Sequence, residues 1–276
     1  MRKNLNKWML VLVYLMLALQ MRKVECAQQN DRLNGLVVLQ DGPLLDAKGY
    51  NNINMMNNGE RAVLAKAIRF DDIVFDVGAH IGEWSLVLLN IQPQVSIYCF
   101  EPVPGLNNKL KNNLNQRPAS INMLALSDVQ GEATFVYYPN HPALSTLHRR
   151  PRVEQRLKMD PVFLNVALER LDNFCDQHQI AHINFLKIDT EGNELNVLRG
   201  AERLLLNREI DLIQFEYGGC YLDSNTTLKQ VYELMTKYGY SIYRIHATGL
   251  IKISQWRQAL ENFQYSNYLA VKEERS

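Results

Sequence analysis

The sequence has few of the features that mark a disulfide framework, a structural zinc site or a polyanion-binding surface. Its 276 residues include four cysteines, which are widely spaced and form no C-x-x-C pair, so we expect neither a disulfide framework nor a zinc finger. The 30 Lys and Arg residues nearly balance the 29 Asp and Glu residues. Because nucleic-acid binding depends on excess positive charge, no nucleic-acid partner is expected.

The N-terminus lacks a hydrophobic run long enough for an ordinary membrane span. Residues 8–19 are all apolar, whereas a spanning helix needs about 17 to 25 residues. Arg2, Lys3 and Lys7 precede the run, as in a secretory signal, but no Ala-x-Ala cleavage site follows it. Three interpretations of residues 1–27 stay open: a cleaved signal, a short membrane anchor and a wrongly chosen start codon. The expected location is therefore a membrane or an exported compartment, or otherwise the cytoplasm.

The rest of the chain has the composition of a globular protein, with 47% hydrophobic and 21% charged residues. Residues 28–58 are polar and rich in Asn, which predicts an irregular lead-in. In residues 59–276, short β-branched runs alternate with longer amphipathic segments. This alternation is typical of an α/β domain in which crossover helices join the strands of a mostly parallel sheet.

The spacing of apolar residues predicts the individual elements. Strands are expected at residues 73–77, 95–100, 121–125, 184–188, 210–216, 241–245 and 268–271. Helices are expected at residues 60–68, 83–90, 105–115, 171–178, 194–206 and 228–238. Two further extended segments, residues 133–138 and 163–168, have no predicted crossover helix between them. We expect this insertion to form a hairpin or lid at the carboxyl edge of the sheet, where ligands bind in such folds.

The first predicted strand ends in a glycine-containing turn, VFDVGAHIGEW. Asp76 ends the strand, and Gly78 and Gly82 let the backbone pass close to a ligand at the start of the next helix. A tight turn without a ligand is the alternative. Glu101 ends the second strand, where a carboxylate can accept hydrogen bonds from the two hydroxyls of an adenosine ribose. Together, the turn and the acid predict a nucleoside-binding pair.

The turn favours S-adenosylmethionine over a nicotinamide dinucleotide. Dinucleotide loops have the pattern G-x-G-x-x-G, but His80 occupies the position of the middle glycine here. The loop therefore provides poorly for the close approach of a pyrophosphate. A loop of mixed polarity suits the amino and carboxylate groups of methionine instead. An NAD(P)-dependent oxidoreductase is the first alternative function. A catalytically inert nucleoside-binding or partner-binding module on the same fold is the second.

Five segments occur in a characteristic order and spacing: VFDVGAHIG, CFEPVP, LALSD, LKIDTEGNELNVLRGA and IQFEY. Together they resemble the FkbM-type S-adenosylmethionine-dependent methyltransferase family, over about residues 70–217. The resemblance implies a Rossmann-like class I methyltransferase fold, with a seven-stranded sheet, an antiparallel closing pair and helices on both faces. It also implies S-adenosyl-L-methionine as the cofactor and methyl transfer, usually to a hydroxyl oxygen.

The resemblance extends to individual residues. It assigns the loop residues Asp76, Gly78, His80 and Gly82 to the cofactor, and Glu101 to its ribose. Ser127 and Asp128 match the adenine-side turn of the family, where an Asp can accept a hydrogen bond from the adenine amino group. For Asp128, an Asx turn that closes a strand is the alternative.

Several acidic residues crowd the end of the fourth predicted strand, in FLKIDTEGNE. Methyl transfer requires alignment of the acceptor with the methyl carbon, and a base assists by removing the hydroxyl proton. Asp189 is the first candidate for this base, and Glu191 is a second functional carboxylate. Lys187 or a nearby His is the alternative base. Glu194 is expected to stabilise the helix dipole instead. These residue types leave open whether a metal is required.

Two further residues are assigned to the acceptor. Glu216 ends the fifth strand at the same edge, and His148 lies in the insertion beside Arg149, Arg150 and Arg152. The arginines either contact an anionic acceptor or, in the favoured interpretation, provide ordinary surface charge. The predicted activity is S-adenosylmethionine-dependent O-methylation of a small molecule or glycan.

Overall fold

A computed structural model describes residues 31–39 and 52–274 of the chain. The hydrophobic N-terminal segment, residues 1–27, lies outside these ranges, and so does its predicted role as a signal or an anchor. Within the described ranges, no helix combines the length and the apolar character that crossing a bilayer requires.

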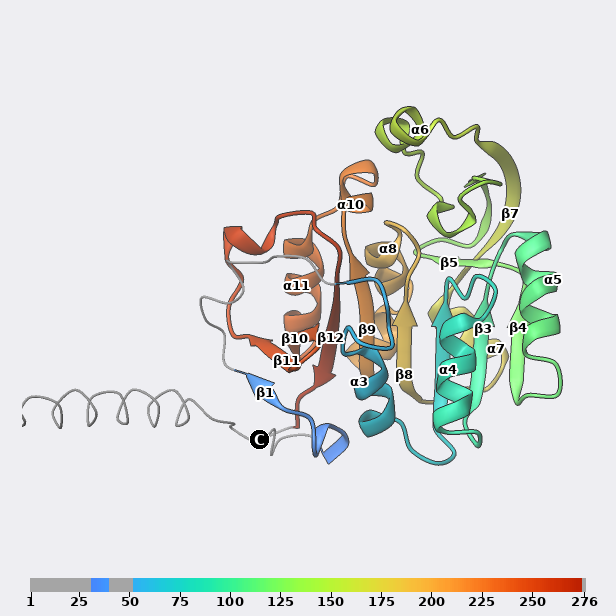
Figure 1. Ribbon diagram of the computed structural model, residues 1–276. Helices are drawn as coiled ribbons and strands as arrows, with labels where there is room; N and C mark the ends of the chain where they lie inside the picture. Colours follow the sequence, from blue (N-terminus) through green and yellow to red (C-terminus); the bar gives the residue numbers. More distant parts are fainter. Residues whose placement is uncertain (1–30, 40–51, 275–276) are drawn as a thin grey trace, which may run out of the picture.

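A large sheet of nine strands forms the centre of the described structure (Figure 1). Its order is β1-β11-β10-β12-β9-β8-β2-β3-β4. The parallel strands are β2 (Ile73–Val77), β3 (Ser96–Phe100), β4 (Ala119–Asn122), β8 (Ile183–Ile188) and β9 (Ile210–Tyr217). β12 (Ser266–Lys272) runs antiparallel to both of its neighbours, β9 and β10 (Tyr240–His246). The predicted α/β class with an antiparallel closing strand is confirmed.

The expectation of seven strands in this sheet was wrong, because two more strands extend one edge. β11 (Gly249–Ile253) forms a hairpin with β10, and β1 (Val38–Leu39), from the predicted irregular lead-in, pairs in parallel with β11. Gly249 has φ +140°, and a Cβ there would lie 2.3 Å from the carbonyl oxygen of Val37. The glycine therefore permits the close approach through which β1 joins the sheet.

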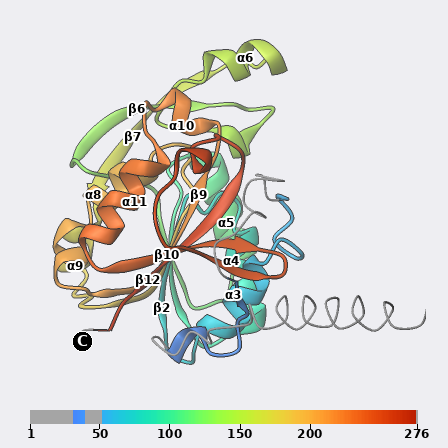
Figure 2. The same cartoon turned by 90° about the vertical axis from the view of Figure 1, so that its left-hand side faces the viewer.

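Helices cover both faces of the sheet (Figure 2). One face carries α3 (Glu60–Ala67), α4 (Glu83–Ile91) and α5 (Pro104–Asn113). The other carries α7 (Leu171–Gln177), α8 (Glu194–Arg199), α9 (Glu202–Leu206) and α11 (Leu228–Lys237). Each face has its own core, and neighbouring residues of β8 serve different cores, Phe185 on one face and Leu186 on the other. This alternation follows from the two-residue period of a strand.

Two predicted elements are each divided in the structure. The helix expected over residues 194–206 is α8 followed by α9, and a Cβ on the intervening Gly200 would lie 2.1 Å from the carbonyl oxygen of Ser127. The strand expected over residues 121–125 ends at Asn122, and the chain then enters a second sheet as β5 (Ala125–Ser127). In the first case, close packing between distant segments accounts for the break between the two helices.

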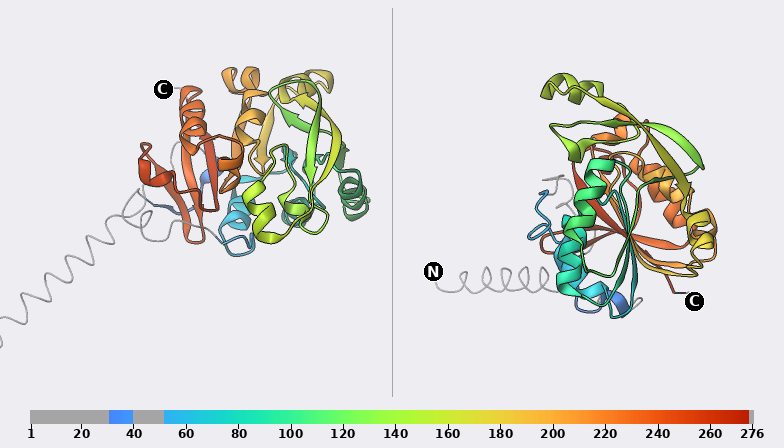
Figure 3. Two further views of the ribbon diagram at one scale, coloured as in Figure 1. Left: turned by 90° about the horizontal axis from the view of Figure 1, so that it is seen from above. Right: turned by 90° about the vertical axis from the view of Figure 1, so that its right-hand side faces the viewer.

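The insertion forms this second sheet across the carboxyl edge of the first (Figure 3). β6 (Gly131–Tyr137) and β7 (Val162–Arg170) form the predicted hairpin, and β5 pairs in parallel with β7. Between β6 and β7 lie η2 (Pro142–Leu144) and the short helix α6 (Pro151–Leu157). α6 was not predicted, because its seven mostly polar residues show no apolar period.

Candidate functional site

A cavity of about 500 Å³ opens at the carboxyl edge of the parallel strands, under the insertion. Its size lies within the range of about 300 to 1,000 Å³ that is usual for small-molecule sites. One group of lining residues, which we call the β3 side, comprises Gly78, Ala79, His80, Trp84, Phe100, Glu101, Pro102, Leu106 and Leu126. A second group, the β8 side, comprises Lys187, Asp189, Thr190, Glu191, Asn193, Glu216 and Tyr265. From the insertion come Phe135, Leu144, Ser145 and Leu147.

The turn after β2 brings the two sides into contact. Gly78 has φ +82°, and a Cβ there would lie 1.8 Å from the carbonyl oxygen of Asp189. Only glycine can occupy this position without moving one loop away from the other. Gly82, at the start of α4, has φ +89°, and a Cβ there would lie 2.7 Å from Leu110 of α5. Gly82 therefore serves helix packing and does not line the cavity.

Glu101 is the acidic group of the β3 side. Its carboxylate accepts backbone N–H groups from His80 (3.0 Å) and Val103 (2.8 Å). The residue is only 5% exposed, and this burial raises the pKa of Glu101 to about 7. Two backbone donors hold the carboxylate in one orientation, with its residue on the cavity wall.

Two polar atoms of the β3 side are buried without a hydrogen-bond partner in the described part of the chain. They are His80 Nε2 and Trp84 Nε1, and both residues line the cavity. His80 also has φ +51°, an uncommon conformation for a residue with a Cβ. Because buried polar groups are nearly always satisfied, these two atoms mark places where a ligand supplies the missing partner.

Asp76 lies behind the cavity wall. It is fully buried and accepts hydrogen bonds from Ser85 Oγ (2.6 Å) and Lys187 Nζ (3.2 Å). The ammonium of Lys187 also lies 3.1 Å from Asp189 and 5.5 Å from the ring centre of Trp84. Burial opposes its charge, but the two aspartates raise the pKa of Lys187. Lys187 is therefore a fixed cation that links β2 to the β8 side.

A carboxyl pair dominates the β8 side. Asp189 and Glu216, at the ends of the neighbouring strands β8 and β9, share a hydrogen bond. Burial, followed by the charges of Asp189 and Glu191, raises the pKa of Glu216 well above its usual value. Burial also acts on Asp189, but Lys187 and the hydrogen bond from Glu216 bring its pKa below the usual value. The pair thus holds one proton, which Glu216 donates to Asp189.

Glu191 anchors the insertion to the β8 side. Arg150 donates from Nη1 to Glu191 (2.6 Å) and from Nε to Asp223 (3.2 Å), which ends α10 (Cys220–Asp223). The Arg150 side chain is only 8% exposed, so the interpretation of Arg150 as surface charge was wrong. Its neighbour Arg149 is exposed and pairs with Glu154 within the insertion. Sequence spacing gave no sign that α10 would bring an acid to Arg150.

Glu194 closes the loop that carries these acids. Its buried carboxylate accepts the N–H and the hydroxyl of Thr190 (2.8 and 2.9 Å) and the N–H of Gly192 (3.0 Å). Burial raises the pKa of Glu194 to about 7. All of these contacts are made to the loop at the start of α8, which agrees with the structural role expected for Glu194.

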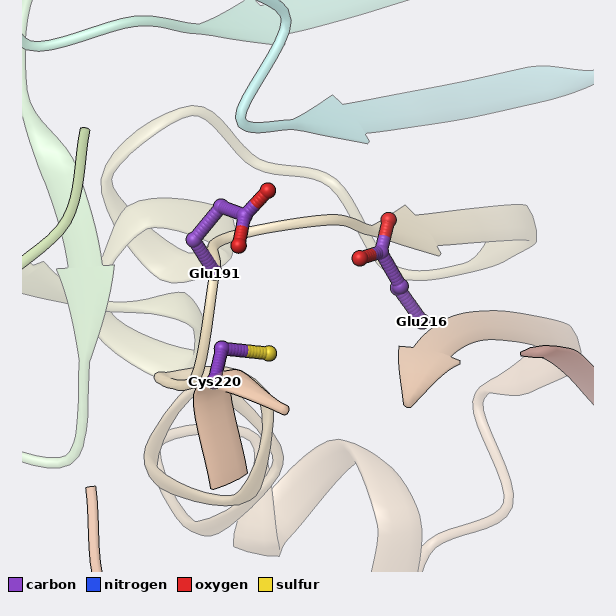
Figure 4. Close-up of side chains that lie close together, drawn as sticks. All are labelled: Glu191, Glu216 and Cys220. Carbon is purple, nitrogen blue, oxygen red and sulfur yellow. The ribbon is translucent and has the colours of Figure 1, made fainter. Parts of the chain in front are cut away.

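One group of side chains has the composition of a metal site (Figure 4). Glu191, Glu216 and Cys220 each place one potential ligand atom within 4.8 Å of the others. However, Glu191 pairs with Arg150, and Glu216 shares its proton with Asp189. Burial and neighbouring carboxylates also raise the pKa of Cys220, whereas metals bind the thiolate. The chemistry of this group therefore does not fit a metal ion.

The comparison with known proteins identifies the family. Residues 76–242, more than half of the chain, match the model of the methyltransferase FkbM domain. The chain belongs to the FkbM methyltransferase family. This match confirms the resemblance noted in the sequence, and with it S-adenosylmethionine as the cofactor of the family.

Several curated methyltransferases are similar to this chain. It is 29% identical over 159 residues to the 31-O-demethyl-FK506 methyltransferase FkbM of Streptomyces tacrolimicus, covering 49% of this chain and 61% of that protein. It is 25% identical over 150 residues to the hexuronic acid methyltransferase AglP of Haloferax volcanii, covering 54% and 57%. The chain therefore spans about three fifths of the length of these relatives. With the 2-O-methyltransferase NoeI of Sinorhizobium fredii, the identity is 21% over 218 residues, covering 74% and 87%.

The chain is also similar to solved structures. A putative rRNA-methylase from Clostridium thermocellum is 8% identical, with a TM-score of 0.45 over 79% of this chain and 95% of that one. At this level, the likeness says nothing about the acceptor.

The β3 side fits the cofactor of the FkbM family. Glu101 can accept hydrogen bonds from ribose hydroxyls, and the unpartnered nitrogens of His80 and Trp84 can be satisfied by polar groups of the ligand. Phe100 and Leu126 provide apolar surface for a flat ring such as adenine.

Besides Asp76 and Gly82, three residues assigned from the sequence lie beside the cavity rather than on its wall. Ser127 donates to the Asp128 carboxylate (3.2 Å), and the backbone carbonyl of Asp128 accepts from Arg170. His148 lies with Nε2 3.3 Å from Asn193 Oδ1, and burial lowers the pKa of His148. Leu126 and Leu147 are their lining neighbours, so these assignments fall one or two residues from the wall.

The sequence analysis did not identify Trp84 or Tyr265 as site residues, and it favoured surface charge for Arg150. For Tyr265, a usable signal was present. Since the closing strand β12 is antiparallel, its beginning lies at the carboxyl edge of the parallel strands. The residue just before a closing antiparallel strand is therefore a candidate for the site.

Proposed function

We propose that this FkbM-family protein is a methyltransferase that uses S-adenosylmethionine to methylate a hydroxyl oxygen of a small molecule or glycan. One observation carries the proposal: a single cavity has a nucleoside-type wall around Glu101 on the β3 side and the carboxyl groups of Asp189 and Glu216 on the β8 side. The arrangement supports binding of the cofactor and the acceptor next to each other.

The β3 side would hold the cofactor. Glu101 would bind the ribose hydroxyls, and Phe100 and Leu126 would contact the adenine ring. When bound, S-adenosylmethionine supplies a methyl group activated by its sulfonium. Gly78 keeps the loop after β2 close to Asp189, so the methionine end of the cofactor would lie next to the carboxyl pair.

The carboxyl pair would orient the acceptor. The hydroxyl that is methylated donates its hydrogen bond to Asp189, whose other partners are Lys187 and Glu216. As the O–C bond formed and the S–C bond of the sulfonium broke, with its electron pair left on sulfur, the acceptor oxygen would become positively charged and strongly acidic, and Asp189 would take its proton. Because the proton leaves only after the O–C bond has formed, a carboxylate with a lowered pKa is a sufficient base. Alignment of the acceptor with the methyl carbon provides much of the remaining rate acceleration. Lys187 stays protonated and therefore holds Asp189 in place.

The names of the relatives support an oxygen acceptor. FkbM and NoeI are both named for methylation at an oxygen, and AglP is named for a hexuronic acid. In contrast, no feature of the described cavity favours a nicotinamide cofactor.

Binding and transfer can be tested separately. In thermal unfolding, S-adenosylmethionine at about 100 times its Kd adds roughly 2.7 kcal/mol to the free energy of unfolding, which raises Tm by roughly 5 to 11 °C. NAD at the same concentration should leave Tm unchanged. Methyl-labelled S-adenosylmethionine should then transfer label to a hydroxylated acceptor. Stabilisation by NAD alone would favour an oxidoreductase, and cofactor binding without transfer to any acceptor would favour an inert module.

A further inference from the structure

A row of buried polar side chains lies behind the β8 side of the cavity. It starts at Glu60 on α3, which is 4% exposed. The Glu60 carboxylate accepts hydrogen bonds from amide nitrogens of Asn58 (2.6 Å), Gln214 (2.6 Å) and Asn267 (3.0 Å). Three donors are an unusually complete set for one buried carboxylate, so the position of Asn267 is well defined.

The row ends at Tyr265 on the cavity wall. The side-chain nitrogen of Asn267 donates one hydrogen to Glu60 and the other to the Tyr265 hydroxyl oxygen (3.1 Å). Because the Tyr265 oxygen is the acceptor in this contact, its own proton is directed elsewhere. No residue in the described ranges accepts that proton. Tyr265 lines the cavity together with Glu216, so the O–H group is available to a ligand there.

The surroundings of Tyr265 keep its proton in place. Burial, followed by the charges of Glu216, Asp189 and Glu60, raises the pKa of Tyr265. The phenol therefore acts as a hydrogen-bond donor throughout the physiological pH range. It is a neutral donor on the wall that also carries the carboxyl groups of Asp189, Glu191 and Glu216.

We propose that the Tyr265 hydroxyl donates a hydrogen bond to the acceptor, at an oxygen next to the hydroxyl that is methylated. This inference rests on the proposed function. A donor at the reacting oxygen would engage the electron pair that attacks the methyl carbon, and Asp189 already accepts the proton of that hydroxyl. Tyr265 therefore binds a second oxygen, and Glu60 and Asn267 are positioning residues. The acceptor class is a molecule with neighbouring oxygens, such as the vicinal hydroxyls of a pyranoside.

The test uses the full chain, methyl-labelled S-adenosylmethionine, and the methyl glycosides of glucose, galactose and mannose with their monodeoxy counterparts. We expect transfer to at least one glycoside, and a rate about 3- to 10-fold lower when the hydroxyl next to the methylated one is missing. Tyr265→Phe should lower kcat/KM for the intact glycoside by the same factor. The acceptor ratio, kcat/KM for the intact glycoside divided by kcat/KM for its deoxy counterpart, should then be close to one. Its Kd for S-adenosylmethionine should stay within about twofold.

Two further variants separate positioning from general damage. Tyr232→Phe removes a hydroxyl on α11 that bonds to the Ser254 carbonyl oxygen and does not line the cavity. It should keep the acceptor ratio of the natural protein. Asn267→Leu should also bring the acceptor ratio close to one. When it is combined with Tyr265→Phe, kcat/KM should fall no further than in Tyr265→Phe alone. The ratio is measured within one preparation, so it does not depend on the fraction of folded protein.

Each outcome decides a different claim. An unchanged acceptor ratio in Tyr265→Phe would overturn the role of Tyr265. Equal rates for glycosides and their deoxy counterparts in the natural protein, or no transfer to any glycoside although S-adenosylmethionine binds, would overturn the acceptor class. Failure to bind S-adenosylmethionine would instead overturn the proposed function itself.

Discussion

The two sides of the cavity are built in different ways. On the β3 side, Glu101 takes its hydrogen bonds from backbone N–H groups 2 and 21 residues away in the sequence. Behind the β8 side, Glu60 and Asn267 form a hydrogen bond although they lie 207 positions apart in the sequence. The geometry of Glu101 is thus set by two consecutive strand-turn-helix units, whereas the support of the β8 side combines segments from both ends of the described domain.

The electrostatics of the two sides differ as well. Glu101 has only neutral backbone partners, so its charge depends mainly on burial. Asp189, in contrast, pairs with the buried cation Lys187 and interacts with the carboxyl group of Glu216. We therefore expect substitutions on the β3 side to change cofactor affinity, and substitutions on the β8 side to change turnover.

The largest effect is expected for Asp189→Asn, which tests whether the β8 side determines turnover. Asp189→Asn keeps the shape of the side chain but removes the group that takes the acceptor proton. In a methyl-transfer assay, kcat should fall by about 10²- to 10⁴-fold. Asp160→Asn, at an exposed position in the insertion, should keep the natural kcat. An Asp189→Asn protein with natural kcat would show that alignment alone carries the reaction.

Glu101→Ala should produce the complementary result. Loss of the buried carboxylate that is proposed to bind two ribose hydroxyls should weaken S-adenosylmethionine binding by at least about 100-fold, because hydrogen bonds to charged groups contribute roughly 1.5 to 3 kcal/mol each. Titration calorimetry measures this Kd, and Glu132→Ala on the exposed part of β6 is the matched control. An unchanged Kd for Glu101→Ala would remove the ribose assignment.

Gly78→Ala tests the contact between the two sides. The added Cβ would lie 1.8 Å from the Asp189 carbonyl oxygen on a backbone with positive φ. We expect a loss of about 2 to 3 kcal/mol in the free energy of unfolding, measured by urea denaturation. Gly105→Ala, where a Cβ would meet nothing within 4 Å, should leave stability unchanged or raise it by up to about 1 kcal/mol. Equal stability of the two variants would mean that the loops can separate without cost.

The smallest expected effect is a pH dependence of cofactor affinity. The pKa of Glu101 is raised to about 7 by burial, and the ionised form accepts the ribose hydrogen bonds. The ionised fraction rises from about one tenth at pH 6 to about nine tenths at pH 8. The Kd for S-adenosylmethionine should therefore be up to about tenfold lower at pH 8 than at pH 6. Glu101→Gln should lose this dependence, and a pH-dependent Glu101→Gln would assign it to another group.

The sequence predicted the parts of the molecule that depend on local pattern. The core strands, the turn at Gly78 and the acid at Glu101 follow from apolar period, glycine placement and strand ends. Residues that depend on tertiary contact were missed. Arg150 became a buried anchor because α10 brings Asp223 to it, and Tyr265 reached the cavity because β12 runs antiparallel. The pairing of Arg150 with Asp223 leaves no mark in the neighbouring sequence, whereas the expected antiparallel closing strand was a usable signal for Tyr265.

The position of Tyr265 also bears on how this domain can be shortened. The region that matches the FkbM family model ends at residue 242, before β12 begins. A recombinant fragment cut to that region would keep Glu101 and the carboxyl pair, but it would lack Glu60, Tyr265 and Asn267. Its β9 would also lose its β12 neighbour and become an exposed sheet edge, which favours aggregation. The smallest fragment that keeps the whole cavity therefore extends from Ile53, which lines it, to the end of β12.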